Sequence, residues 1–455
     1  RRGGEQRAVA GDDRVRHAAV LALRHDRLPL AVGPQALLEH GHVPVEAVAG
    51  ADIVFSEHSI MDTLFRASAF GTSDHLMAQV AKAPGAETKA GETQFASGQA
   101  LIKFLATSSL RSAFSMKFDE LFRRNPQQIL ALWVGIIAHG VNIDRTAFER
   151  REAVLGMHAI FEGVNVFPEI LPVLSDAYMY TSYSVRRDKH DAKAMIHRLC
   201  ALLLSRHSVA LPKFPANREL VARPTVLVCL EWFTSLHAMY RCYVSLLRQL
   251  HRDFRVVALA RAIAVDDISR QEFDEVYDVP SEGMTIQDHA RRIADVIKPD
   301  VIWYPSLGME MLWVVLASVR LAPVQVMSLG HPSSSRSPAM DYVICDDGAI
   351  GDPALFSETV LTYPDGSARF EMRPDADLPA VERDDRPAVV NVAVPAMMCK
   401  LNAPFMQALQ DIAARSARPR CPAEPVMRTV RVMALPCSLS ESAQALRSAA
   451  RRRAL

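Results

Sequence analysis

His237 is the first residue whose type and position could serve catalysis. It ends the loop Glu231–His237, between the apolar run Thr225–Leu230 and a segment with the apolar spacing of a helix. A histidine at the head of a helix, beyond the carboxyl end of a strand, could accept a proton or hydrogen-bond a phosphate oxygen. The alternative is a histidine that is merely solvated at a helix start, because this residue type is common in loops.

Lys400 is the second candidate, and it is the last lysine of a chain dominated by arginine. It follows the apolar run Ala388–Val394 and precedes the helix-like segment Pro404–Ala414. A diphosphate bound there would meet both the amides of a helix N-terminus and an ammonium charge. A solvated loop lysine is the alternative.

Two further loops follow strand-like runs. The loop Tyr304–Met309 contains Pro, Ser and Gly, which form tight turns and expose backbone N–H groups. The loop Leu329–Arg336 contains Gly330, which permits unusual backbone angles, and Ser333–Ser335, whose hydroxyls could bind a sugar or a phosphate. Each loop is also compatible with an ordinary connection, so neither is specific by itself.

These loops would be positioned by an alternation of strands and helices that begins at Arg223. Continuous apolar, β-branched runs of strand length are typical of strands buried on both faces of a parallel sheet. Strands that alternate with helices at this spacing predict βαβ units and a doubly wound sheet. The expected strands are Thr225–Leu230, Arg255–Ala260, Val301–Tyr304, Val324–Leu329 and Tyr342–Cys345, and the expected helices are His237–His251, Thr285–Lys298 and Met309–Arg320.

The preceding part of the chain has a different periodicity. Apolar residues recur there at spacings of three and four, which predicts a mostly helical N-terminal domain. No fixed repeat of helix pairs is present in the letters. The expected helices are Ser59–Phe70, Gly98–Ser108, Pro126–His139, Ala153–Gly163, Val173–Tyr180 and Asp191–Ser205.

The C-terminal part reads as the opening of a second Rossmann-like domain. The strand Ala388–Val394 and the helix Pro404–Ala414 follow an acidic, Pro-containing linker. Residues 416–455 are rich in arginine, contain no lysine or aromatic residue, and hold one plausible strand, Val426–Leu435. Because a Rossmann-like domain needs roughly 150 residues, we expect the second domain to be incomplete.

The predicted domains thus follow one another along the whole chain. They are a poorly structured extension (1–54), a helical N-terminal domain (55–222), a first Rossmann-like domain (223–374), a linker (375–387), the start of a second Rossmann-like domain (388–415) and a divergent Arg-rich tail (416–455).

Composition narrows the classes of function. Lys and Arg number 52 against 51 Asp and Glu, so no overall charge favours nucleic acid or an anionic membrane. The longest apolar run, Met309–Leu329, is interrupted by Arg320 and Pro323 and predicts a buried helix and strand instead of a membrane span. The seven scattered cysteines show no metal-ligand spacing, so we expect no metal and a reducing, cytoplasmic location. The Gly-rich, P-loop, zincin and nucleophile-elbow motifs are absent.

Five motifs in this order resemble one family, the cytoplasmic N-glycosyltransferases that modify bacterial adhesins. These enzymes are related to O-GlcNAc transferase, within glycosyltransferase family 41. The resemblance covers about Arg223–Asp411 continuously and extends more weakly over the helical part. The motifs are Ser235–Arg241, Tyr304–Met309, Leu321–Pro332 with Asp341-Tyr-Val, Phe356–Thr359 and Val394–Asn402.

The resemblance implies a helical N-terminal domain on an α/β fold of the GT-B type. It implies an inverting, metal-independent glycosyltransferase without a cofactor, with UDP-glucose or a similar UDP-hexose as co-substrate and an acceptor protein bearing Asn-x-Ser/Thr sites. By position, His237 matches the active-site histidine and Lys400 the lysine that neutralises the UDP diphosphate. Gly330, His331 and Pro332 match the loop that lines the cleft.

The sequence also departs from the family. Trp232-Phe-Thr stands where the family usually has another histidine, and Ala238 follows His237 where the family has serine. The residues that hold uracil and ribose have no counterpart before residue 455, so we expect an incomplete donor site and question whether this chain alone is active. Two alternatives stay open: a non-catalytic remnant whose helical domain binds a protein partner, and a GT-B enzyme with a small-molecule acceptor.

Overall fold

The described part of the chain lies mostly after residue 98. The computed structural model describes residues 98–112, 121–123, 126–138, 144–161, 163–164, 171–207, 209–214, 221–280, 283–364, 370–371, 389–394, 400–416 and 429–434, together with 71–75, 86–89, 92–95 and four single positions before residue 71. The extension 1–54, the helix Ser59–Phe70 and the linker 375–387 lie outside these residues, apart from single positions. The chain divides into two compact units, one formed by residues 155–381 and the other by residues 1–154 with 382–455.

A parallel sheet of seven described strands organises the unit 155–381. Its order is β5-β4-β3-β6-β7-β8-β9, and each neighbouring pair is parallel. The strands are β3 (Thr225–Leu230), β4 (Arg255–Arg261), β5 (Glu275–Val279), β6 (Val301–Tyr304), β7 (Val324–Ser328), β8 (Tyr342–Asp346) and β9 (Thr359–Tyr363). The predicted Rossmann-like α/β fold is therefore confirmed.

The two outer strands, β5 and β9, were not expected from the sequence. Both lie at an edge of the sheet and are largely exposed or half-buried, so polar residues interrupt their apolar ones. The inner strands have the opposite pattern, and Val226–Leu230 and Val256–Ala260 are buried throughout. Continuous apolar runs thus predicted the inner strands of this sheet, and the two edge strands lacked such runs.

Helices cover the sheet, as the alternation predicted. After the strands come α10 (Ala238–Leu250), α11 (Asp267–Arg270), α12 (Ile286–Arg291) with a π-helical extension (Arg292–Ile297), and α13 (Met311–Leu316). The apolar face of α10, with Tyr243, Val244 and Leu247, packs into the same core as β3 and β4. This packing fixes the start of α10, where His237 lies, relative to the sheet.

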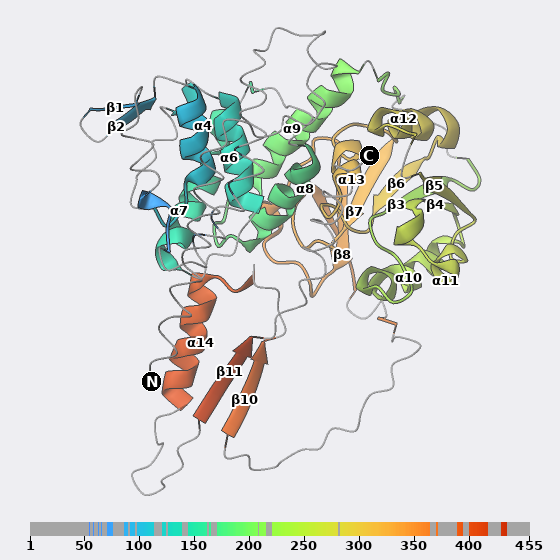
Figure 1. The fold of residues 1–455 in the computed structure, drawn as a ribbon. Coiled ribbons are helices and arrows are strands. Elements are labelled where there is room, and N and C mark those ends of the chain that lie inside the picture. The colour runs from blue at the N-terminus through green and yellow to red at the C-terminus, as the bar shows by residue number, and fades with distance from the viewer. Residues whose placement is uncertain are drawn as a thin grey trace, which may run out of the picture. The chain divides into compact units, whose positions relative to one another are not determined.

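Two helices from the predicted N-terminal domain belong to this same unit. They are α8 (Leu171–Tyr180) and α9 (Asp191–Arg206), and both pack against α13 (Figure 1). The sequence boundary at residue 222 separates them from the sheet, whereas the structure divides the helical segment near residue 154. Buried polar contacts between α9 and the loop after β7, described below, explain why α8 and α9 stay with the sheet.

The other unit contains α4 (Gly98–Thr107), which packs on α6 (Pro126–Ala138), then α7 (Arg145–Leu155) and a hairpin of β1 (Ala86–Lys89) and β2 (Glu92–Phe95). It also contains β10 (Val389–Val394), α14 (Ala403–Ser416) and β11 (Thr429–Ala434). β11 pairs in parallel with β10. The strand–helix–strand pattern therefore extends into the segment that the sequence separated as an Arg-rich tail. Among the described helices, none is long and apolar enough to span a membrane.

Candidate active site at the carboxyl edge of the sheet

The strand order places a switch point between β3 and β6. From β3 the chain proceeds outward through β4 and β5, and then returns to β6 on the other side of β3. Ligands of open α/β sheets bind outside the carboxyl ends of the strands at such a point, because the neighbouring loops diverge there. The sequence motifs 231–237, 304–309 and 329–336 lie at the carboxyl ends of β3, β6 and β7 and in the loops that follow them.

His237 is the N-cap residue of α10. Its ring Nδ1 accepts a hydrogen bond from the backbone N–H of Met239 at 3.2 Å. The backbone N–H of His237 donates to the carbonyl of Thr234 at 2.8 Å. Because Nδ1 is an acceptor, the neutral ring carries its hydrogen on Nε2. The helix start therefore fixes the orientation of the half-buried imidazole.

The loop that carries His237 is fixed at two further points. The N–H of Phe233 donates to the carbonyl of Ala264 at 2.7 Å. Ser235 donates to Asp266 from its backbone N–H at 2.8 Å and from its hydroxyl at 2.7 Å, and these bonds help to lower the pKa of Asp266 to about 2, although burial opposes them. Asp266 also caps α11. The loops after β3 and β4 are thereby joined.

Glu231 joins the loop after β3 to the loop after β6. Its carboxylate accepts the backbone N–H groups of Gly308, Met309 and Glu310 at 2.9, 2.7 and 3.0 Å. It also accepts the hydroxyl of Ser306 at 2.8 Å. The N–H groups that the sequence interpretation offered to a ligand are thus bound by the chain's own carboxylate.

Gly330 connects the loop after β7, in which it lies, to the loop after β6. Its N–H donates to the carbonyl of Pro305 at 3.0 Å. A Cβ atom at this position would lie 2.3 Å from Cε of Met239 and 2.6 Å from the Pro305 oxygen. Gly330 is not among the described glycines with positive φ, so it does not use the backbone freedom that glycine permits. The residue is required here because the first turn of α10 and the loop after β6 approach its backbone closely.

His331 is buried, whereas Pro332 beside it is exposed. The Nε2 of His331 lies 2.7 Å from the hydroxyl of Ser182. Burial, followed by the charges of Lys193 and Lys189, holds the pKa of His331 well below its usual value. The ring is therefore neutral and bonded to a neighbouring segment of the same unit.

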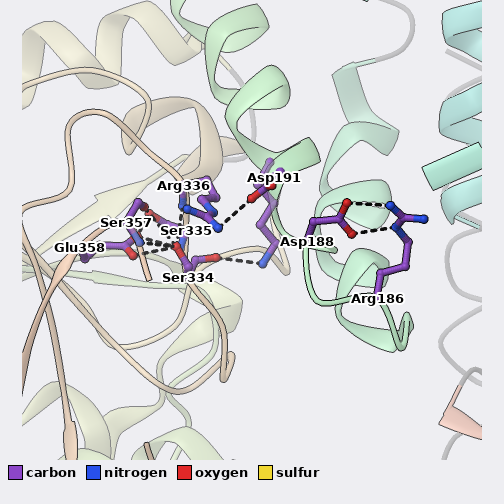
Figure 2. A network of polar contacts seen from close by, with 9 residues as sticks. Arg186, Asp188, Asp191, Ser334, Ser335, Arg336, Ser357 and Glu358 are labelled. Atoms are coloured by element: carbon purple, nitrogen blue, oxygen red, sulfur yellow. Dashed lines mark hydrogen bonds and ion pairs between the residues drawn. The ribbon is translucent and has the colours of Figure 1, made fainter. Parts of the chain in front are cut away.

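The serines after Pro332 face the interior of the protein instead of a ligand. Lys193, on α9, donates to the hydroxyl of Ser333 at 2.6 Å and to the carbonyl of Ser334 at 3.3 Å. Glu358 accepts the hydroxyl of Ser334 and the backbone N–H of Ser335, both at 2.8 Å, and also the Ser335 hydroxyl. Figure 2 shows Ser334 and Ser335 beside Glu358. All three serines are buried, so the hypothesis that their hydroxyls bind a sugar or a phosphate is wrong.

The same loop bonds to α8 and α9 through further polar contacts. His197 on α9 lies with Nε2 3.1 Å from the carbonyl of Ser335 and with Nδ1 2.8 Å from the hydroxyl of Ser318. Tyr178 donates to that same carbonyl at 3.2 Å. Arg336 pairs with Asp191 at 2.7 Å (Figure 2). The helices therefore hold the backbone that follows the Gly330–Pro332 loop.

Lys400 belongs to the other compact unit. It is exposed, and it stands two residues before Asn402, whose side chain accepts the backbone N–H of Phe405 at 3.0 Å in the first turn of α14. This agrees with its expected place before a helix N-terminus. The structure brings the His237 and Gly330 loops together, and it describes Lys400 in the separate unit.

Three buried charged residues of this region were not singled out from the sequence: Glu231, Lys193 and Glu358. Glu231 begins the loop that ends at His237, and Glu358 lies within the motif Phe356–Thr359, yet neither residue type signals burial. A buried carboxylate is unusual enough to be informative only once its burial is known.

Comparison with known proteins agrees with the resemblance found in the motifs. The family model described as HMW1 domain 2 matches residues 119–204. The UDP-glucose:protein N-beta-glucosyltransferase of Actinobacillus pleuropneumoniae serotype 5b (strain L20) is 27% identical over 369 residues. The protein of the same name from serotype 7 (strain AP76) is 26% identical over 370 residues. Each match covers 78% of this chain and 58% of the relative, so the chain spans less than two thirds of these curated relatives.

A solved structure is similar as well: a mutant of the Thermobaculum terrenum O-GlcNAc transferase matches with a TM-score of 0.47 and 16% identity, covering 89% of this chain and 73% of that one. The observed fold defines the class, a Rossmann-like α/β protein with attached helices. Within that class, the chain is similar in sequence to two UDP-glucose:protein N-beta-glucosyltransferases, and the resemblance of the motifs is confirmed.

Proposed function

We propose that the chain is a protein glycosyltransferase that transfers a hexose from a UDP-sugar to asparagine side chains of an adhesin-like acceptor. The observation that carries the proposal is the match to two UDP-glucose:protein N-beta-glucosyltransferases across 78% of this chain. The position of His237 at the switch point of the sheet supports it. We place the activity in the cytoplasm, because the family that the motifs resemble works there.

In the proposed reaction, the asparagine amide nitrogen attacks the anomeric carbon of the hexose from the face opposite the diphosphate. The bond between that carbon and the β-phosphate oxygen breaks, its electron pair leaves with UDP, and the nitrogen releases one proton to water. The anomeric configuration is inverted. Negative charge develops on the diphosphate, so the protein accelerates the step chiefly by stabilising that charge.

Lys400 and the N-terminal amides of α14 would supply positive charge to the leaving diphosphate. With those groups present, no metal and no further cofactor is required, and we propose that none is used. His237 would act as a donor from Nε2, because Nδ1 is occupied by the N–H of Met239. This geometry supports orientation of the donor phosphate or of the acceptor amide more than proton removal by the histidine.

The test is transfer by the purified 455-residue chain. A peptide with an Asn-x-Ser/Thr site is incubated with UDP-glucose and, separately, with other UDP-hexoses, and mass spectrometry locates any added hexose. A matched peptide with glutamine in place of the asparagine is the acceptor control. The expected result is one added hexose on asparagine, with equimolar release of UDP.

Two variants connect the test to the proposed site. Lys400→Ala is expected to lower kcat/KM for the UDP-sugar at least about tenfold, because a point charge at the diphosphate is lost. Lys213→Ala removes another exposed lysine, which the structure places in the unit of the sheet, and should leave transfer unchanged. If UDP were released only when a small-molecule acceptor is present, the result would instead support a GT-B enzyme with a small-molecule acceptor. Acceptor binding without affinity for UDP would support the non-catalytic protein.

A further inference from the structure

We propose that Glu231 is a positioning residue of the candidate site: its buried carboxylate holds the loop after β6 against the end of β3 and thereby sets the place of Gly330. This inference rests on the proposed function for its catalytic consequence. Its structural content, a loop held in place by one side chain, can be tested separately.

Four hydrogen bonds converge on the side chain of Glu231. Oε1 of Glu231 accepts three successive backbone N–H groups, from Gly308, Met309 and Glu310, and Oε2 accepts the hydroxyl of Ser306. Successive N–H groups that point to one centre form a concave anion site. Here the anion belongs to the chain, so the loop has the geometry of an anion-binding loop around an internal carboxylate.

The loop that Glu231 holds contacts Gly330 at one end and Tyr178 of α8 at the other. Pro305 begins this loop, and its carbonyl accepts the N–H of Gly330 at 3.0 Å. At the other end of the turn, Gly308 has φ of +129°, and a Cβ there would lie 2.8 Å from Cδ1 of Tyr178. The loop is thus confined between Gly330 and α8, and a shift of the loop must move one of these neighbours.

Glu231 has no direct role in the proposed chemistry, because it is buried and its oxygens are bonded. Glu231 is 1% exposed, and both of its oxygens already accept hydrogen bonds. It therefore reaches no substrate. A group in this situation acts through the loop that it holds.

The charged and titratable neighbours also fit a structural anion. Glu310 carries its own side chain toward Arg261, at 3.4 Å, and so does not compete for the N–H groups. Tyr178 from α8 stays protonated, since burial and then the charges of Glu358 and Glu231 hold its pKa well above the usual value. Burial raises the pKa of Glu231 to about 7, while its four hydrogen bonds favour the charged form. The carboxylate is retained at an energetic cost, which is expected where loop position matters.

Two conservative variants separate geometry from charge. Glu231→Gln keeps the reach of the side chain: its amide oxygen can accept the three N–H groups, and its NH₂ can donate to the Ser306 hydroxyl. Glu231→Asp keeps the charge but withdraws the carboxylate by one methylene. If position is the role, E231Q is nearly normal and E231D is impaired.

Gln325 offers a matched control at the other end of the sheet. It is fully buried, and its Oε1 accepts the backbone N–H groups of Leu321 at 2.6 Å and Ala322 at 3.3 Å, next to the amino end of β7. Gln325→Asn shortens a side chain that anchors a loop in the same way, far along the strand from the candidate site.

Hydrogen–deuterium exchange of the full chain is the first measurement. In E231D the amides of residues 306–310 and 329–331 should exchange at least about tenfold faster than in the wild type, and in E231Q they should not. Gln325→Asn should speed exchange around residues 321–322 only. Unchanged protection of 306–310 in E231D would overturn the positioning role.

Transfer kinetics are the second measurement. We expect kcat/KM to fall about tenfold or more in E231D and to stay within about threefold in E231Q and Gln325→Asn. Equal losses in E231D and Gln325→Asn would reduce Glu231 to a general stabilising residue and refute the proposal. A wild-type chain without turnover counts against the proposed function alone, because the exchange experiment still decides for or against the loop-holding role.

Discussion

Nζ of Lys193 lies 2.6 Å from Oγ of Ser333, so a fully buried ammonium on α9 is bonded to the loop that contains His331. Burial is the main cause that holds the pKa of Lys193 well below its usual value, and the charge of Glu358 opposes it. Serine hydroxyls and backbone groups separate the two charges, since Ser334 bonds to both residues. α9 is in this way part of the framework of the candidate site.

Replacing Lys193 should weaken the fold and reveal its coupling to Glu358. Lys193→Met removes the donor to Ser333 and to the Ser334 carbonyl, so we expect the free energy of unfolding to fall by about 1–3 kcal/mol. The double variant with Glu358→Gln should lose less than the sum of the single losses, because a lone buried charge costs more than none. Chemical denaturation of the four chains measures the cycle. Strictly additive losses would contradict the coupling, and Lys213→Met, at an exposed site, should change stability by less than about 0.5 kcal/mol.

His237 should show separate capping and chemical roles. His237→Ala removes the acceptor for the Met239 N–H, so the free energy of unfolding should fall by about 1 kcal/mol. His237→Ser restores a good N-cap acceptor without the imidazole and should be close to wild type in stability. Both variants should lower kcat at least about 100-fold if Nε2 serves the reaction. A fully active His237→Ser chain would leave the imidazole with a capping role only.

The sequence predicted the inner strands of the sheet and the position of His237, but neither the edge strands nor the bonding of Ser333–Ser335. Apolar runs predicted β3, β4, β6, β7 and β8, and the place of His237 at a helix start followed from the change of period after Leu230. The edge strands β5 and β9 were not predicted, because they form strands by pairing with a neighbouring strand and their own residues show no continuous apolar run. The prediction that Ser333–Ser335 bind a ligand was wrong for a related reason. A sequence does not distinguish a hydroxyl exposed to solvent from one that is bonded to a buried lysine such as Lys193.

Gly330 should tolerate no side chain, for lack of space. Gly330→Ala places a methyl group 2.6 Å from the Pro305 oxygen and still closer to Met239, so we expect a loss of about 2 kcal/mol or more in the free energy of unfolding. Adding Met239→Ala should not restore stability, because the backbone oxygen remains in the way. Gly351→Ala is the control, since a Cβ there meets no atom within 4 Å. Equal stability of the two single variants, measured by thermal unfolding, would refute the close approach.

The pH dependence of stability should reveal the buried carboxyl of Glu231. Its pKa in the folded chain is about 7, raised by burial from an ordinary value near 4.5. Between these values the folded chain binds more protons than the unfolded chain, so the contribution of this group to stability is complete below about pH 4.5 and is lost as the pH rises through about 7. The full difference is on the order of 3 kcal/mol. E231Q stays neutral at every pH, so its free energy of unfolding should gain on that of the wild type by this order between pH 4.5 and 8. Buried histidines such as His197, whose pKa burial lowers to about 3, titrate alike in both chains and cancel in the comparison. Urea denaturation of the two chains at several pH values gives the two curves, and parallel curves would show that the carboxyl does not titrate in this window.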